Sequence, residues 1–267
     1  MIPRFLAHLL HPMMTMILKK QVVHRIHYLN TPPVVESNAI WCCNHGAKYD
    51  TPYCGLAIPR QVWLVAGKQR LTIADRVFFI LNGCIWVDRK DKDSKAAAAK
   101  RMLALAKKGE DIFMFPEGTW NTFPSLPMMP MAWGIIDLSA NSGCPIIPLV
   151  MEYREKDCYI KFGEPIQCNP KDDKLERINT LRDIMATLRW DIWEQLPRYR
   201  RADIPDDEWE KEVAARVAAY PPLDFAYEQS CVRKEKGAIT YEEAFAHLDK
   251  LIPCRENAFL LRKKNMY

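Results

Sequence analysis

The chain has 267 residues, of which 49% are hydrophobic and 27% charged, with 10 glycines, 19 prolines and no biased repeat. This length and composition predict one large α/β domain, alone or with an appendage, and exclude a disordered, collagenous or solenoid protein. The net charge of +5 is concentrated at one end, because residues 1–35 carry +4 of it.

Residues 1–30 have the pattern of an amphipathic helix. Apolar side chains recur at steps of three and four residues, and the charged side chains are all basic: Arg4, Lys19, Lys20 and Arg25. The longest stretch without a charged side chain, Phe5–Leu18, has 14 residues, whereas a membrane-spanning helix needs about 20. We therefore expect residues 1–30 to be a membrane anchor on an anionic lipid surface, with packing on the protein's own core as the alternative.

The same end of the chain bears on localisation and partners. Lys19-Lys20-Gln21 follows the apolar run where a secretory signal would have small residues for cleavage, so we expect the cytoplasmic face of a membrane and a peripheral or monotopic attachment. Nucleic acid is not expected as a partner, because the rest of the chain is nearly neutral and has no recognisable binding motif.

Beyond this segment, short apolar runs alternate with helical patterns, which predicts a mostly parallel central sheet flanked by helices, an α/β fold. The predicted strands are Ala39–Cys43, Val62–Ala66, Cys84–Asp88, Ile112–Phe115, Ile146–Met151 and Cys158–Phe162. The predicted helices are Leu71–Leu81, Ser94–Lys108 and Ala132–Asn141, and Gly109 and Gly143 stand where helix ends favour a left-handed residue.

The C-terminal third is predicted to be helical. Asp172–Leu196 has the pattern of a long helix, and residues 197–205 that of a connector. Asp206-Asp207-Glu208 opens another helix, and Thr240 with Glu243 three residues later is typical of a capping box. We expect a core domain over residues 31–202 and a helical appendage of unknown purpose over residues 203–267.

The nine cysteines are odd in number, include the adjacent pair Cys42 and Cys43, and have no C-x-x-C spacing. We expect reduced and mostly buried thiols, no disulfide and no metal site.

The first candidate site is Asn44-His45-Gly46-Ala47-Lys48-Tyr49-Asp50, directly after a predicted strand. A strand-to-helix turn would let the Asp50 carboxylate bind one imidazole nitrogen of His45 and leave the other free as a general base. This pair resembles the His–Asp half of a hydrolase triad, but the G-x-S-x-G nucleophile elbow is absent.

Two further blocks place their polar residues at the carboxyl ends of predicted strands. Gly83-Cys84-Ile85-Trp86-Val87-Asp88-Arg89 delivers an arginine, the side chain best suited to phosphate, to the end of a strand. In Phe115-Pro116-Glu117-Gly118-Thr119, the glycine allows backbone amides to approach a ligand oxygen.

In this order, the three blocks resemble those of the glycerolipid acyltransferases, the family of 1-acyl-glycerol-3-phosphate and lysophospholipid acyltransferases. Its N-H-x-x-x-x-D box is similar to Asn44–Asp50, its G-x-I-x-x-D-R box to Gly83–Arg89 and its F-P-E-G-T box to Phe115–Thr119. A fourth block, P-I-I-P, is similar to Pro145-Ile146-Ile147-Pro148. The resemblance covers roughly residues 30–200.

The resemblance implies transfer of a fatty acyl group from acyl-CoA or an acyl carrier protein to a hydroxyl of a lysophospholipid, first of all 1-acyl-glycerol-3-phosphate, giving phosphatidic acid. His45 would be the base and Asp50 would fix its tautomer, and Arg89, Glu117, Gly118 and Thr119 would bind or position the acceptor. The segment around Pro148 would support the site or the acyl-donor end. It implies neither a cofactor nor a metal.

The chain departs from the family pattern at positions that carry charge. Trp120 and Asn121 stand where Arg and Ser usually follow E-G-T, Ala132 replaces a common lysine, and Ala47 replaces a serine. Lys68 or Lys48 could compensate for the two lost cations. The alternatives are therefore an acyltransferase for another lipid hydroxyl, including an amino-acid lipid, and a catalytically silent lipid-binding relative.

Overall fold

The computed structural model describes residues 12–13, 15–20, 22–47, 50–68, 79, 83–123, 126–196, 205, 207–218 and 225–233. The chain divides into two units, residues 1–233 and 234–267, and all described residues belong to the first. The predicted capping box at Thr240 lies outside the described residues, as do residues 1–11 and, apart from Phe79, the helix predicted over Leu71–Leu81. The domain boundaries at residues 30 and 202 stay predictions.

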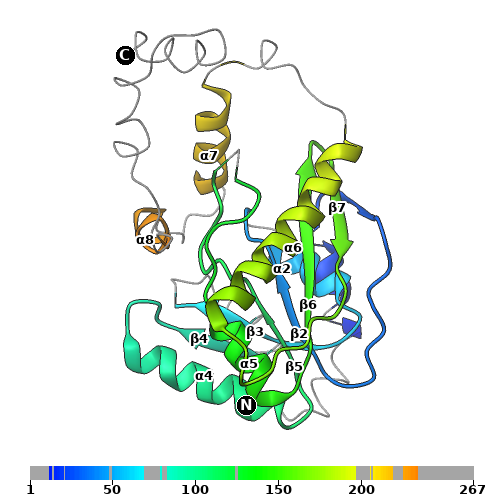
Figure 1. Ribbon diagram of the computed structural model, residues 1–267. Helices are drawn as coiled ribbons and strands as arrows, with labels where there is room; N and C mark the ends of the chain where they lie inside the picture. The colour runs from blue at the N-terminus through cyan, green and yellow to red at the C-terminus, as the bar shows by residue number, and fades with distance from the viewer. Residues whose placement is uncertain are drawn as a thin grey trace, which may run out of the picture. The chain divides into compact units, whose positions relative to one another are not determined.

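A single seven-stranded sheet organises the described residues (Figure 1), in the order β1-β7-β6-β2-β5-β3-β4. The strands are β1 (Arg25–Tyr28), β2 (Ile40–Cys43), β3 (Val62–Gly67), β4 (Cys84–Val87), β5 (Asp111–Met114), β6 (Ile146–Arg154) and β7 (Asp157–Phe162). Strands β2 to β6 run parallel to one another, β7 is antiparallel to β6, and β1 is parallel to β7. The predicted α/β fold with a mostly parallel sheet is confirmed.

The core has two layers because successive side chains of a strand point to opposite faces. On one face, Ile40 and Cys42 of β2 pack with helices α4 (Lys92–Ala106), α5 (Gly134–Ser142) and α6 (Lys174–Gln195), which lie on the same side of the sheet in Figure 1. On the other face, Trp41 and Cys43 pack with α2 (Asp50–Ala57). Two further helices among the described residues are α7 (Glu208–Ala218) and α8 (Phe225–Ser230).

Helix and strand positions agree closely with the sequence patterns. The predicted helices Ser94–Lys108, Ala132–Asn141 and Asp172–Leu196 correspond to α4, α5 and α6. Gly109 and Gly143 have φ angles of 82° and 77°, as their place at the helix ends predicts. Strand β6 continues to Arg154, past the predicted end at Met151.

The N-terminal segment differs from the prediction of one helical element over residues 1–30. Residues 15–20 are helical, but Arg25–Tyr28 forms the edge strand β1, held by its ladder with β7 and by an Arg25 Nε to Asp157 Oδ1 contact of 2.8 Å. Leu18 is buried against Gly55 of α2, whereas Met13 and Met16 are exposed. The described part of this segment therefore packs partly on the core, as in the alternative interpretation.

No helix among the described residues has the length and apolar character that crossing a membrane requires.

Candidate active site

The candidate site lies along one edge of the sheet. Because β2, β3, β4 and β5 are parallel, their carboxyl ends meet at this edge. They are followed there by His45, Lys68, Arg89 and Glu117, respectively. The sheet topology therefore collects the three sequence blocks, which are far apart in the chain, into one region.

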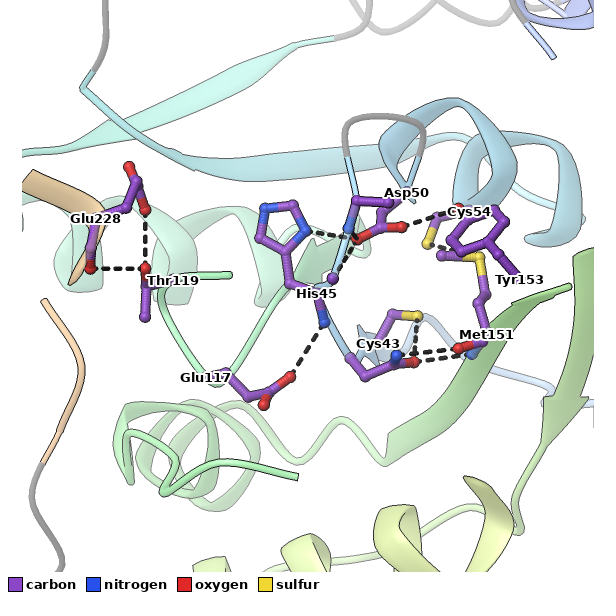
Figure 2. A network of polar contacts seen from close by, with 12 residues as sticks. Cys43, His45, Asp50, Cys54, Glu117, Thr119, Met151, Tyr153 and Glu228 are labelled. Carbon is purple, nitrogen blue, oxygen red and sulfur yellow. Dashed lines mark hydrogen bonds and ion pairs between the residues drawn. The ribbon is translucent and has the colours of Figure 1, made fainter. Parts of the chain in front are cut away.

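His45 and Asp50 contact each other across the turn between β2 and α2. The His45 Nδ1 lies 2.7 Å from the Asp50 Oδ2, and the same oxygen accepts the backbone N–H groups of Gly46 (2.7 Å) and Ala47 (2.9 Å). Because helix α2 starts at Asp50, the carboxylate bends back over the loop that carries the histidine. The second ring nitrogen of His45 lies on the far side of the ring from Asp50 (Figure 2).

The other carboxylate oxygen of Asp50 is also occupied. Tyr153, near the end of β6, donates its hydroxyl to Oδ1 at 2.8 Å. The Asp50 side chain is only 2% exposed, and an ionised carboxylate surrounded by donors accepts hydrogen bonds only. The proton in the His45–Asp50 contact therefore belongs to Nδ1, which leaves Nε2 as an acceptor.

Asn44 anchors the loop that carries His45 at the point where β2 ends. Its side-chain amide donates to the Met151 carbonyl (3.0 Å) and accepts from the Met151 N–H (2.8 Å), so that it continues the β2–β6 ladder where β2 ends. Asn44 is buried, and a buried amide that is satisfied on both sides holds its segment in one conformation.

Aromatic rings hold the His45 imidazole in place. Phe115 is stacked on it, with ring centroids 4.0 Å apart and an interplanar angle of 14°, and Trp120 meets it edge-on at 5.7 Å and 73°. Trp120 is buried, and it stands where the family pattern has an arginine. The His45 side chain keeps 19% of its surface exposed, so the ring remains accessible to a reactant.

Glu117 is buried beneath the site, and its carboxylate binds two backbone N–H groups. One of its carboxylate oxygens accepts the His45 N–H at 3.0 Å and the other the Met129 N–H at 2.7 Å (Figure 2 shows the first). Burial raises the pKa of Glu117 to about 7, although these two backbone donors oppose the shift. Glu117 is 1% exposed, and both of its carboxylate oxygens are bound by these backbone groups.

Arg89 is engaged by a residue from the C-terminal part of the chain. Its Nη1 donates to the Gly118 carbonyl (2.6 Å) and to the Glu228 Oε2 (2.8 Å), and its Nη2 to the Glu228 Oε1 (2.5 Å). Thr119 donates its hydroxyl toward the same Oε2 at 2.9 Å. Burial lowers the pKa of Arg89, but Glu228 outweighs it and raises the pKa above its usual range.

Of the remaining predicted residues, Gly118 and Lys68 lie at the same edge. Gly118 has a φ of 74°, which suits the turn in which its N–H donates to the Phe115 carbonyl at 3.0 Å. Lys68 is exposed and follows Gly67 at the end of β3, and Lys48 lies outside the described residues. Pro148 lies inside β6, paired with Cys42 of β2.

Buried thiols line the sheet beside the histidine. Cys42 and Cys43 are fully buried, and burial raises the pKa of both well above the usual value. A thiol held in its protonated form is a poor nucleophile, so neither suits a covalent acyl intermediate. In the part of the chain that the structure describes, no group of three or more His, Cys, Asp or Glu side chains could hold a metal ion.

Two residues of the site were missed by the sequence analysis. Tyr153 stands beyond the predicted end of its strand, although it continues the alternation of Leu149 and Met151 on the α2 face. Glu228 lies in α8, inside the region treated as an appendage, and nothing in the sequence pattern connects it with Arg89.

The comparison with protein families agrees with this geometry. Residues 20–152 match the Acyltransferase family model, and this stretch holds all four blocks, from Asn44 to Pro148. Residues 20–152 therefore form an acyltransferase domain.

Two known proteins show the likeness in sequence and in fold. The chloroplastic 1-acyl-sn-glycerol-3-phosphate acyltransferase BAT2 of Brassica napus is 33% identical over 69 residues, which are 26% of this chain and only 20% of that protein. The crystal structure of PlsC, the 1-acyl-sn-glycerophosphate acyltransferase of Thermotoga maritima, matches with a TM-score of 0.58 at 13% identity, over 73% of this chain and 83% of that chain. The second comparison concerns the fold alone.

Proposed function

We propose that the protein transfers a fatty acyl group from an acyl thioester, carried by CoA or an acyl carrier protein, to the hydroxyl of a lysophospholipid. The observation that carries the proposal is the His45–Asp50 contact at the edge of the sheet, with one ring nitrogen bound and the other available. The first candidate acceptor is 1-acyl-glycerol-3-phosphate, because both relatives described above are named for acylation of this glycerolipid. The product would be phosphatidic acid.

The reaction needs one base and no covalent enzyme intermediate. The His45 Nε2 removes the proton from the acceptor hydroxyl, and the oxygen attacks the thioester carbonyl. Asp50 stabilises the imidazolium that forms. The tetrahedral intermediate then expels the thiolate, so a C–O bond replaces the C–S bond and the proton passes from His45 to the leaving sulfur. No cofactor or metal takes part in the proposed reaction.

The polar network beneath the histidine supports this role through preorganisation. Tyr153 and two backbone N–H groups hold the Asp50 carboxylate, and Glu117 holds the backbone of His45 from below. A base that is fixed before the substrate arrives loses little free energy to reorganisation during the reaction.

We place the enzyme at a membrane surface, on its cytoplasmic face, because an acceptor with a long acyl chain seldom leaves the bilayer. Lys19 and Lys20 are exposed at the end of the helical segment 15–20, and the exposed Met13 and Met16 precede them. Basic and apolar side chains of this kind suit an anionic lipid surface.

Two alternatives keep the same site but change its use. The acceptor hydroxyl could belong to another lysophospholipid or to an amino-acid lipid, and the replacement of Arg by Trp120 favours an acceptor with less negative charge. A silent lipid-binding relative would not need the His45–Asp50 contact, so its presence favours an enzyme.

The decisive experiment incubates the purified protein with labelled acyl-CoA or acyl carrier protein and a panel of lysolipids, and identifies the products by mass. We expect one acceptor class to be acylated and His45→Ala to lower the rate by at least about 100-fold, the usual scale for loss of a general base. His27→Ala is the matched control, because His27 lies in the edge strand β1, away from His45, and contacts Asp157. This variant should retain activity. Near-normal turnover by folded His45→Ala protein would refute the mechanism.

A further inference from the structure

Helix α8 brings a carboxylate to the side chains that the family resemblance assigns to the acceptor. Glu228 is 6% exposed, and both of its carboxylate oxygens face the guanidinium of Arg89. The Thr119 hydroxyl lies 2.9 Å from Oε2 and also 2.9 Å from the Glu228 carbonyl (Figure 2). Two of the predicted acceptor-binding side chains are thus bound to one carboxylate of the protein itself.

The donors that Glu228 occupies are those a phosphate would use. A guanidinium offers two parallel N–H groups to carboxylate and phosphate alike, and a neighbouring hydroxyl adds a third donor. The Arg89 Nε is buried and has no hydrogen-bond partner among the described residues, and a Cβ at Gly67 would lie 3.0 Å from it. Since Gly67 of β3 lies against the Nε side of the guanidinium, the Nη1 and Nη2 donors that Glu228 now binds are the ones we assign to an incoming phosphate.

We propose that Glu228 determines acceptor specificity by competing with the anionic head group of the acceptor for Arg89 and Thr119. The proposal rests on the function proposed above and deepens it, because it concerns the acceptor end of the same site. An acceptor with a phosphate monoester must displace Glu228, whereas an acceptor without a negative charge leaves the Arg89–Glu228 pair intact.

The Arg89 guanidinium is only partly buried, and another cation lies close to it. The Arg89 side chain is 19% exposed, and the Tyr227 ring beside Glu228 lies 4.9 Å from both the Arg89 Cζ and the Lys90 Nζ. If Glu228 leaves, Lys90 and the exposed Lys68 stay at the same edge of the sheet to attract an anion. A head-group phosphate would then replace one anion on Arg89 with another.

The test measures binding of sn-glycerol 3-phosphate, a soluble probe of the head group, by titration calorimetry on the full chain. Glu228→Gln keeps the shape of the side chain and removes its charge. Because a hydrogen bond to a charged group is worth about 1.5–3 kcal/mol, we expect the dissociation constant to fall about 10- to 100-fold. The double variant Arg89→Ala with Glu228→Gln should lose this gain. Glu210→Gln, which removes an exposed charge in α7, should bind the probe as the unmodified protein does.

A Glu228→Gln protein that binds the probe equally or more weakly would overturn the proposal, since Glu228 would then orient Arg89 or play no part. If Glu228→Gln fails to fold, Glu228→Asp, whose carboxylate is one methylene further from Arg89, should give a smaller gain of the same sign, and no gain would count against the proposal.

Binding is read without turnover, so a gain in affinity in a protein that acylates no lysolipid would refute the proposed function and leave the competition intact. In an active enzyme, Glu228→Gln should lower KM for a phosphate acceptor but not for 1-acylglycerol.

Discussion

The charge of Asp50 can be separated from its geometry by Asp50→Asn. In an asparagine at this position, the carbonyl oxygen is expected to stay at the site of Oδ2, because the Gly46 and Ala47 N–H groups both point there. The amide NH2 would then face Tyr153, whose hydroxyl can rotate to accept a hydrogen bond. His45 therefore keeps its tautomer, and the substitution removes the negative charge opposite the imidazolium that the proposed mechanism forms.

The expected loss of kcat follows from the 2.7 Å contact between His45 and Asp50 and from the burial of both groups. Two unit charges whose centres are about 4 Å apart interact by about 4 kcal/mol at an effective dielectric constant of 20, and partial exposure of His45 reduces this to about 3 kcal/mol. We expect kcat of Asp50→Asn to fall by about 100-fold with little change in KM. The assay is steady-state acyl transfer at several pH values, with circular dichroism as the folding control. A loss below about 3-fold would show that the carboxylate charge does not act in the reaction.

Three further predictions concern the surroundings of the site. Tyr153→Phe removes a hydrogen bond to a buried carboxylate and should lower the free energy of unfolding in urea by about 1–3 kcal/mol and kcat by less than about 10-fold; a gain in stability would contradict the assigned contact. The pKa of Glu117, about 7 in the folded chain against 4.5 normally, means that between these pH values the folded chain keeps a proton that the unfolded chain releases. The stability that Glu117 contributes is therefore complete below pH 4.5 and is lost as the pH rises to about 7. Between pH 5 and pH 8, the free energy of unfolding in urea should fall by about 2–3 kcal/mol less in Glu117→Gln than in the unmodified protein. An equal fall in both proteins would refute the pKa shift. Charge reversal of Lys19 and Lys20 to Glu should weaken sedimentation with anionic vesicles by at least about 30-fold, at about 1 kcal/mol per lysine, while unchanged sedimentation would exclude these lysines from the membrane contact.

The sheet and the histidine loop could be predicted from sequence because their signals are local. Each parallel strand is a short apolar run, and the polar residues of each site block stand where a run ends, so the shared edge of a parallel sheet already places them together. The contact between His45 and Asp50 spans five residues and needs only a strand-to-helix turn. Pro52, in the first turn of α2, is compatible with a helix that starts at Asp50.

The parts that escaped prediction depend on contacts between distant segments. Tyr153 reaches Asp50 across 103 residues, and Glu228 reaches Arg89 across 139. Neither residue has a local pattern that separates it from an ordinary strand tyrosine or surface glutamate. Strand β1 was missed for a related reason, because Arg25–Tyr28 is an edge strand whose register comes from β7, and its exposed side chains give no apolar alternation.

The charge balance at the acceptor end connects the sequence departures with the structure. The two positions where the family pattern has Arg and Lys hold Trp120 and Ala132, and the Trp120 ring packs on His45 instead of facing a ligand. Arg89, the cation that the family resemblance assigns to the acceptor, is paired with Glu228. A dianionic phosphate entering this site would meet less positive charge than the family pattern provides, and it would gain Arg89 only by displacing a carboxylate. The departures from the family pattern therefore lie at the proposed acceptor end, where positive charge is lost, whereas the His45–Asp50 contact of the pattern is kept.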